Sequence, residues 1–208
     1  MEKFNENNQV EVKGEIVSDF KFSHEIYGES FYIVEVAVKR LSDFVDHLPV
    51  LISERLIDIT KNFRGQFIIV NGEFRSFNMP NEGKSKLILT VFAKEINFVD
   101  VDEIEDYDAN TIIINGYLCK EPIYRKTPKG REIADILVAV NRAYGKSDYI
   151  PCICWGRTAR YISVFGPGDR VKLTGRIQSR EYFKRLNDEE VESRIAYEVS
   201  VGTLEIVC

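Results

Sequence analysis

The chain has 208 residues, of which 44% are hydrophobic and 29% are charged, the composition of an ordinary globular protein with room for one large or two modest domains. No uninterrupted apolar run approaches the ~18 residues of a membrane span, and the amino terminus lacks the apolar stretch of a secretory signal. We therefore expect a cytoplasmic protein that has no membrane segment.

The four cysteines form neither a CxxC motif nor a cluster with either histidine, so no disulfide framework and no zinc site is predicted. No nucleophile–base pair, carboxylate pair or glycine-rich phosphate loop occurs at a workable spacing. The sequence thus predicts no catalytic residue, no metal ligand and no cofactor, and an enzyme is the weakest interpretation.

The net charge of −5 is unevenly divided along the chain. Residues 109–208 carry 16 Lys and Arg against 12 Asp and Glu, a balance of +4, which leaves 12 against 21, or −9, for residues 1–108. A polyanionic ligand is therefore expected on the C-terminal half.

The predicted elements are mostly short strands, because polar and apolar residues alternate. In chain order, strands are expected at 7–17, 34–40 and 65–76 in the first half, and at 109–119, 136–142, 149–155 and 171–182 in the second. Only "SERLIDITKNF" (53–63) and "RTARYISVF" (157–165) have a helical pattern, one in each half. Between the halves, "VDVDEIEDYDAN" is an acidic and poorly patterned connector.

The two halves repeat each other in sequence. At an offset of 102, Gly14 aligns with Gly116 and Pro49 with Pro151; at an offset of 103, three more pairs align, Gly65 with Gly168, Gly72 with Gly175 and Ser76 with Ser179. We predict two copies of one domain, at residues 1–98 and 109–208, joined by an acidic linker at 99–108. Five antiparallel strands and one short helix per copy favour an all-β fold of two small closed barrels, although the pattern alone leaves a sandwich open.

Strand parity predicts which side chains face outward. In "VKLTGRIQSREY", Val171, Leu173 and Ile177 form an apolar row, and the alternate positions, from Lys172 to Tyr182, are polar or aromatic. In "YIPCICW", Ile150, Cys152 and Cys154 are predicted to face the interior, and Tyr149, Pro151, Ile153 and Trp155 the outside.

The second copy resembles the bacterial single-stranded DNA-binding protein family over residues 109–207. The resemblance rests on the Asn-led first strand, the "PIYRKTPKG" turn, "AVNR", the Trp-Gly before the helix, and "GRIQSREYF". The first copy is similar more distantly, through "VEVKGEIV", "VAVKRLS" and "GEFRS".

This resemblance implies tandem OB-folds that bind single-stranded DNA regardless of base sequence, in replication, recombination or repair, with bases stacked on aromatic rings and phosphates held by Lys and Arg. The stacking positions implied are Tyr144, Tyr149, Trp155 and Tyr182. The candidate phosphate-binding positions at or beside the family motifs are Arg125, Lys126, Arg142, Arg157, Arg176 and Arg180.

The first copy departs from this pattern. Opposite the four aromatic positions it has Ser42, His47, Ser53 and Met79. We therefore expect it to serve packing, oligomerisation or partner contact, with a minor phosphate path offered by Lys39, Arg40, Arg55, Arg64 and Arg75.

The family assembles four OB-folds around the strand, so the resemblance implies a homodimer of this two-copy chain, associated with the nucleoid. The chain ends in "VGTLEIVC" without the acidic tip by which the family recruits replication or repair proteins, which leaves such partners open. The alternative function is an OB-fold protein-interaction module, a primosome-like accessory or scaffold with weak or no nucleic-acid binding, because a fold can persist while its ligand changes. A preference for RNA over DNA also stays open.

Overall fold

The computed structural model describes residues 7–40, 42, 44–81, 84–100, 102, 109–185 and 191–207. The strands of the first half are β1 (Asn8–Ile16), β2 (Lys21–Ile26), β3 (Glu29–Lys39), β4 (Val45–Ser53), β5 (Phe67–Asn81) and β6 (Lys84–Val99). Those of the second half are β7 (Asn110–Leu118), β8 (Ile123–Lys126), β9 (Glu132–Asn141), β10 (Ser147–Trp155), β11 (Arg170–Arg185) and β12 (Val191–Ile206). A 3-10 turn (Ala143–Gly145) precedes β10, and the α-helix α1 (Gly156–Ile162) follows it.

Five strands close a barrel in each half. In the first barrel, β1 pairs with both β3 and β5, and the circuit is completed through β4 and β6. The second barrel repeats this order with β7, β9, β10, β12 and β11. The prediction of an all-β fold with two small tandem barrels is confirmed.

The five-stranded barrels are as predicted, but one additional strand per copy was not predicted and one detail of the barrels is wrong. Each half has a sixth strand, β2 or β8, added as a hairpin to the free edge of β3 or β9. Moreover, the barrels are not wholly antiparallel, since β4 pairs with β6, and β10 with β12, in the parallel direction. A parallel pair needs a long crossover, and in the first half this crossover includes residues 54–66 and β5.

Only the second copy has the predicted helix. There, α1 buries Ala159 and Ile162. In the first copy residues 54–66 form turns instead, because short polar side chains bind the nearby backbone: Asp58 accepts from the Thr60 amide at 3.2 Å, and Asn62 from the Arg64 amide at 2.9 Å. Such local bonds compete with helical hydrogen bonds.

The barrel interiors follow the predicted strand parity. Val171, Leu173 and Ile177 are buried, and so are Ile150, Cys152 and Cys154 on β10. Burial raises the pKa of Cys154 to about 12, so this cysteine is a core side chain and not a reactive thiol. Ile153 was expected outside but is buried, because β10 is flanked there by Asp135 of β9 and Ser200 of β12.

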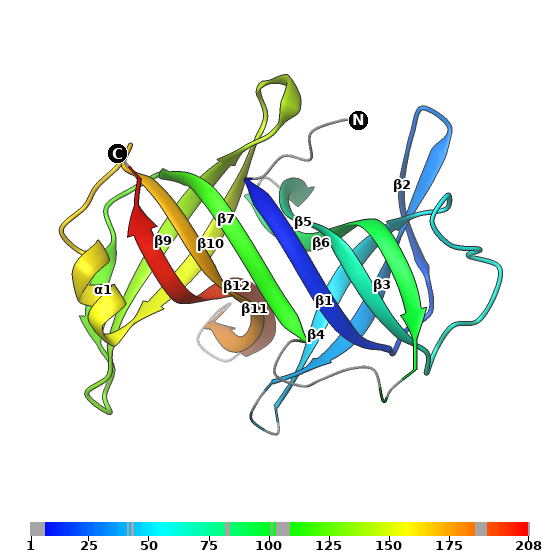
Figure 1. The fold of residues 1–208 in the computed structure, drawn as a ribbon, viewed down its shortest axis with the longest axis horizontal. Helices are drawn as coiled ribbons and strands as arrows, with labels where there is room; N and C mark the ends of the chain where they lie inside the picture. The colour runs from blue at the N-terminus through cyan, green and yellow to red at the C-terminus, as the bar shows by residue number, and fades with distance from the viewer. Residues whose placement is uncertain are drawn as a thin grey trace.

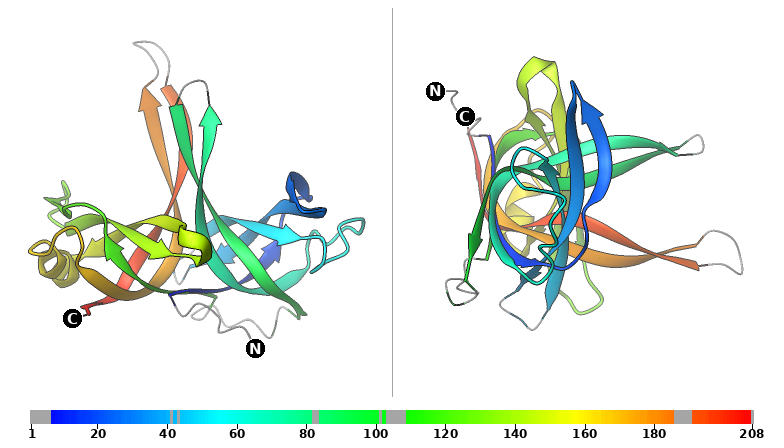
Figure 2. Two further views of the ribbon diagram at one scale, coloured as in Figure 1. Left: turned by 90° about the horizontal axis from the view of Figure 1, so that it is seen from above. Right: turned by 90° about the vertical axis from the view of Figure 1, so that its right-hand side faces the viewer.

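Main-chain pairing of β1 with β7 joins the barrels into one sheet. Six strands, β6-β5-β1-β7-β11-β12, lie side by side across the face in Figure 1. The hairpins β5–β6 and β11–β12 extend beyond the barrels as two long arms that project from the opposite side of the molecule (Figure 2). The two copies are therefore related by an approximate two-fold arrangement around the β1–β7 pair.

The strands of the two barrels begin at Asn8 and Asn110 and end at Val99 and Ile206. Most of the expected linker, 99–108, lies outside the described residues, so the domain boundaries stay predictions. No helix in the described ranges is long and apolar enough to span a membrane.

Candidate nucleic-acid interface

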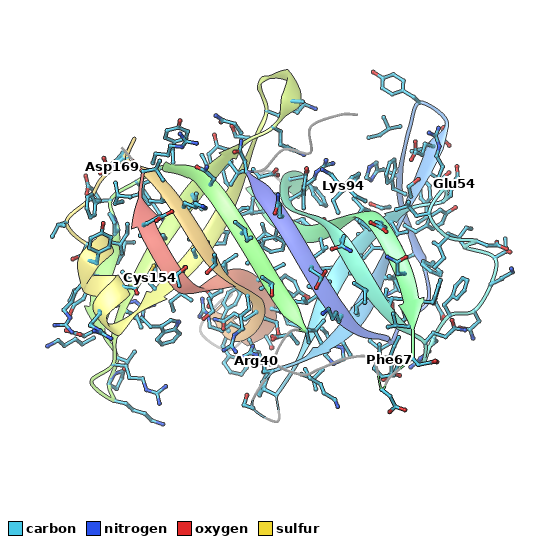
Figure 3. All side chains as sticks on the ribbon, viewed as in Figure 1. Arg40, Glu54, Phe67, Lys94, Cys154 and Asp169 are labelled. Atoms are coloured by element: carbon cyan, nitrogen blue, oxygen red, sulfur yellow. The ribbon has the colours of Figure 1, made fainter. Side chains whose placement is uncertain are left out.

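Buried polar contacts fix the junction between the two barrels. Asp46 of β4, 1% exposed, accepts hydrogen bonds from the backbone amide and the hydroxyl of Ser179, at 2.7 and 2.8 Å, on the β11 arm of the second barrel. Arg40 donates twice to the same carboxylate, at 2.6 Å each, and once to the Ser179 carbonyl oxygen at 2.9 Å. Arg40 of the first copy is thereby held against the second barrel, where Figure 3 labels it beside the β11–β12 arm.

The repeat places a matching contact on the other side. Asp148, fully buried, accepts a hydrogen bond from the Ser76 amide at 2.6 Å. Arg142 Nε lies 3.1 Å from Asp148 Oδ2 but is not oriented to form a hydrogen bond. The sequence-predicted phosphate ligand Arg142 is thus part of the junction.

A groove of about 500 Å³ opens beside the Arg40 contact, on the outer surface of the second barrel. We call it the arginine groove; it is lined by Arg40, Arg131, Trp155, Arg176, Gln178, Ser179, Arg180 and Ser200. Three of these, Trp155, Arg176 and Arg180, were predicted site residues. The groove brings four guanidinium groups and one indole ring together.

Trp155 offers a ring that is oriented and accessible. Its indole N–H donates to the Ser200 hydroxyl at 3.1 Å, which fixes the edge of the ring, while 39% of the residue stays exposed. Trp155 is the last residue of β10 and immediately precedes α1, so both elements hold its backbone. A fixed, exposed ring is the feature that base stacking requires.

The groove also carries uncompensated positive charge. Arg131 and Arg176 form no ion pair with any of the residues that the structure describes. Arg180 Nε lies 3.7 Å from a Glu198 carboxylate oxygen, a long contact, and Glu198 also accepts from Gln178 at 2.8 Å. The groove is therefore complementary to an anionic ligand.

The other predicted stacking residues do not line this groove. Tyr149 is 46% exposed on the same face of β10, but it lies about 20 Å along the strand from Trp155. Its amide donates to the Ser76 hydroxyl at 2.7 Å, so it belongs to the junction. Tyr182 is half-buried on the arm, opposite Arg194. Tyr144 lies in the 3-10 turn, and its side chain is outside the part of the chain that the structure describes.

The remaining predicted cations are dispersed. Arg125 is paired with Asp135 at 2.7 Å on the β8 hairpin, and Lys126 is exposed at the end of the same strand. Arg157 is exposed on α1. None of these three lines the groove.

Two groove residues were missed or undervalued from sequence. Arg131 follows the "TPKG" turn directly, so its place beside the family motif was an available signal. Arg40 was expected only as part of a minor path on the first copy, since nothing local in the sequence shows that it crosses to the second barrel. Within the described ranges, no group of three or more His, Cys, Asp and Glu side chains could hold a metal ion.

Comparison with known proteins finds relatives that bear the name of single-strand binding proteins. The model of the single-strand binding protein family matches residues 109–207. The chain is 34% identical over 80 residues to single-stranded DNA-binding proteins B and A of Bacillus subtilis, an alignment that covers 35% of this chain, 71% of protein B and 46% of protein A. It thus spans most of the first relative and about half of the second.

The fold as a whole also has solved counterparts. The wild-type single-stranded DNA binding protein from Thermus aquaticus superposes with a TM-score of 0.74 at 21% identity, covering 97% of this chain and 93% of that chain. At this identity the likeness establishes a common fold, and the coverage includes both barrels.

Proposed function

The chain belongs to the single-strand binding protein family, and we propose that it binds single-stranded DNA, independently of base sequence, in the arginine groove of its second barrel. The observation that carries this proposal is the position of Trp155 among Arg131, Arg176 and Arg180. Every base has a π-face, so stacking on an indole ring does not select among sequences. Guanidinium groups contact phosphates, which every sequence shares.

In this mechanism Trp155 stacks a base, with its own edge held by Ser200. Arg176 and Arg131 contact phosphates, since neither is paired with a carboxylate among the described residues. The bound DNA would meet the first barrel at Arg40, whose charge is balanced by Asp46. We propose a role in DNA replication, recombination or repair, as a cytoplasmic, nucleoid-associated binding protein without catalysis or a cofactor.

The unpaired arginines favour this function over a protein-interaction module. A protein-binding surface derived from this fold would not need a fixed ring among uncompensated cations.

Beyond the single chain, we propose a homodimer that presents four OB-folds, in line with the family resemblance. Light scattering that gives twice the chain mass of 24.0 kDa would support this dimer, and a monomeric mass would contradict it.

Trp155 provides the test, because it is the only tryptophan and lies in the proposed site. Titration with an oligo-dT at low salt should quench its fluorescence, and added salt should reverse the quenching as counterions return to the DNA. The proposal fails if neither quenching nor a gel shift is seen at low ionic strength. An oligo-U titrated in parallel measures the preference for DNA over RNA.

The stacking role is tested by Trp155→Ala, with a labelled oligo-dT followed by anisotropy. Loss of one stacked base is worth ~1–3 kcal/mol, so affinity should fall by about 5- to 150-fold. Tyr161→Ala is the matched control, since Tyr161 is an exposed aromatic residue of α1 outside the groove. Equal losses in the two variants would show that the groove is not the site.

A further inference from the structure

The first barrel has a surface equivalent to the arginine groove, but with different side chains. In the second barrel, Arg176 lies opposite Ser200 on paired strands. At the repeat offset of 103 the counterpart of Arg176 is Glu73, and Glu73 lies opposite Phe92. The parallel pair confirms this correspondence, because Phe92 pairs with Leu51 as Ser200 pairs with Ile153. The first barrel therefore has a carboxylate in place of the groove arginine and an aromatic ring in place of Ser200.

This first-barrel ring is already covered by the protein. The guanidinium carbon of Arg75 lies 3.6 Å from the centroid of the Phe92 ring. Phe31 packs against Phe92 with ring centroids 6.0 Å apart, and His24 stacks on Phe31 at 5.1 Å with an interplanar angle of 13°. The side chains of the barrel itself thus take up stacking contacts that a base would otherwise make.

The cations of this surface are also held by carboxylates. Glu73 is only 5% exposed. Its carboxylate accepts from Arg75 Nε at 3.0 Å, lies 2.9 Å from Arg75 Nη2, and accepts a hydrogen bond from Lys94 Nζ. Nearby, Arg55 is paired with Glu29 at 3.2 Å.

Glu73 stays ionised in this cluster. Its burial acts to raise its pKa, but the hydrogen bonds and charges of Lys94 and Arg75 outweigh burial and hold the pKa below its ordinary value. At neutral pH the carboxylate is therefore available to hold Arg75 over the ring.

We propose that Glu73 closes the first-barrel surface to single-stranded DNA by fixing Arg75 on Phe92, so that each chain binds one strand segment, on the second barrel and the junction. This inference rests on the function proposed above. For a base to stack on Phe92, it would have to displace Arg75 from both the ring and the carboxylate. Glu73 thus sets the binding-site size of the chain.

The test starts from a chain whose arginine groove is disabled by Trp155→Ala and Arg176→Gln together. With the first barrel closed, this double variant should bind oligo-dT at least 20-fold more weakly than the native chain. Adding Glu73→Gln should restore affinity by about tenfold, because Arg75 is then released from its carboxylate. In the native background, Glu73→Gln should increase the number of nucleotides occluded per chain.

Glu95→Gln is the matched control, since it removes the same charge from the exposed surface of β6, one residue from Lys94. If the two glutamate variants behave alike, the gain is a general effect of charge and the proposal is overturned. Thermal unfolding of each variant verifies that it is folded.

A second measurement uses only the first-barrel surface in an otherwise native chain. Arg75→Ala with Phe92→Ala should leave oligo-dT affinity within twofold, because neither side chain contacts the strand. A loss of fivefold or more would show that the surface is open and that Arg75 or Phe92 binds DNA. Tryptophan quenching in the native chain separates these outcomes from a failure of DNA binding itself.

Discussion

At the scale of single residues, ion pairing decides which arginines can act on a ligand. Arg40, Arg75 and Arg125 are each paired with a carboxylate at 2.9 Å or less, whereas Arg176 has no such partner among the described residues. A paired guanidinium must lose its carboxylate, or share it, before it can neutralise a phosphate. A count of basic residues therefore overstates the positive surface of this protein.

Arg176→Gln should reduce the salt dependence of DNA binding. Each phosphate contact contributes a slope of ~0.7 to the plot of log affinity against log salt for a single strand, so the slope should fall by about that amount. Arg125→Gln is the control, because Arg125 is paired with Asp135 outside the groove. Affinities measured at four or more salt concentrations distinguish the two variants, and a larger change for Arg125→Gln would contradict the assignment.

At the scale of elements, two repeated glycines allow the first strand of each barrel to pair on both sides. A Cβ on Gly14 would lie 2.2 Å from the Ala37 carbonyl oxygen, and a Cβ on Gly116 would lie 2.4 Å from that of Ala139. These close approaches occur where β1 meets β3 and where β7 meets β9. Closure of each barrel therefore requires glycine at these two positions, which explains why Gly14 and Gly116 align in the sequence repeat.

Gly116→Ala should destabilise the protein by about 3 kcal/mol, because the methyl group can be accommodated only by moving β7 away from β9. Gly202→Ala is the control: the nearest atom to its Cβ would be the Thr174 carbonyl oxygen at 3.6 Å, an ordinary contact. The control should change the free energy of unfolding by less than about 0.5 kcal/mol. Urea unfolding gives both values; similar values for the two variants would show that the β7–β9 corner is not tightly packed.

At the scale of the whole molecule, two equivalent buried aspartates hold the barrels together in different protonation environments. Burial acts to raise the pKa of Asp46, but hydrogen bonds from Arg40 and Ser179 outweigh it and hold the pKa below its ordinary value. Burial raises the pKa of Asp148, since the bond from the Ser76 amide and the charge of Arg142 do not offset it. The junction is therefore symmetric in backbone but asymmetric in electrostatics.

Asp46→Asn should cost about 3 kcal/mol at pH 7, because it leaves Arg40 without its carboxylate, and Asp148→Asn about 1 kcal/mol or less. The pH dependences should be opposite. The contribution of Asp46 to the free energy of unfolding is present above its pKa in the unfolded chain, ~3.9, and is lost as pH falls through its lower pKa in the folded protein. The contribution of Asp148 to the free energy of unfolding is present below the unfolded pKa of ~3.9 and is lost as pH rises through its higher pKa in the folded protein.

Unfolding in urea at several pH values between 3 and 7 tests this pair. The cost of Asp46→Asn should shrink below pH 4, and the cost of Asp148→Asn should shrink as pH rises from 4 to 7. Parallel profiles for the two variants would show that the two halves of the junction are electrostatically equivalent.

Much of the fold was accessible from sequence because barrel strands leave a local pattern. The alternation of Val171, Leu173 and Ile177 with polar residues predicted an interior face that the structure confirms. The helix predicted in the first copy is absent. The hydrophobic pattern of residues 53–63 contains no information on the hydrogen bonds that Asp58 and Asn62 form with the nearby backbone, and these bonds compete with a helix. Local periodicity also carries no information on whether β4 pairs with β6, or in which direction.

The sequence by itself determined the repeat, the tandem barrels, the family resemblance and the outward position of Trp155, since each depends on residue order or strand parity. Only the tertiary structure decided which charges are free. It brought Arg40 to the second barrel, paired Arg142 with Asp148 and joined Glu73 to Arg75 and Lys94. The Arg40–Ser179 contact depends on the β1–β7 pairing that places the barrels side by side, and the Glu73–Lys94 pair depends on the pairing of β5 with β6. The Arg142–Asp148 and Glu73–Arg75 pairs join residues that are close in the chain, but the burial of Asp148 and Glu73 is set by the tertiary fold.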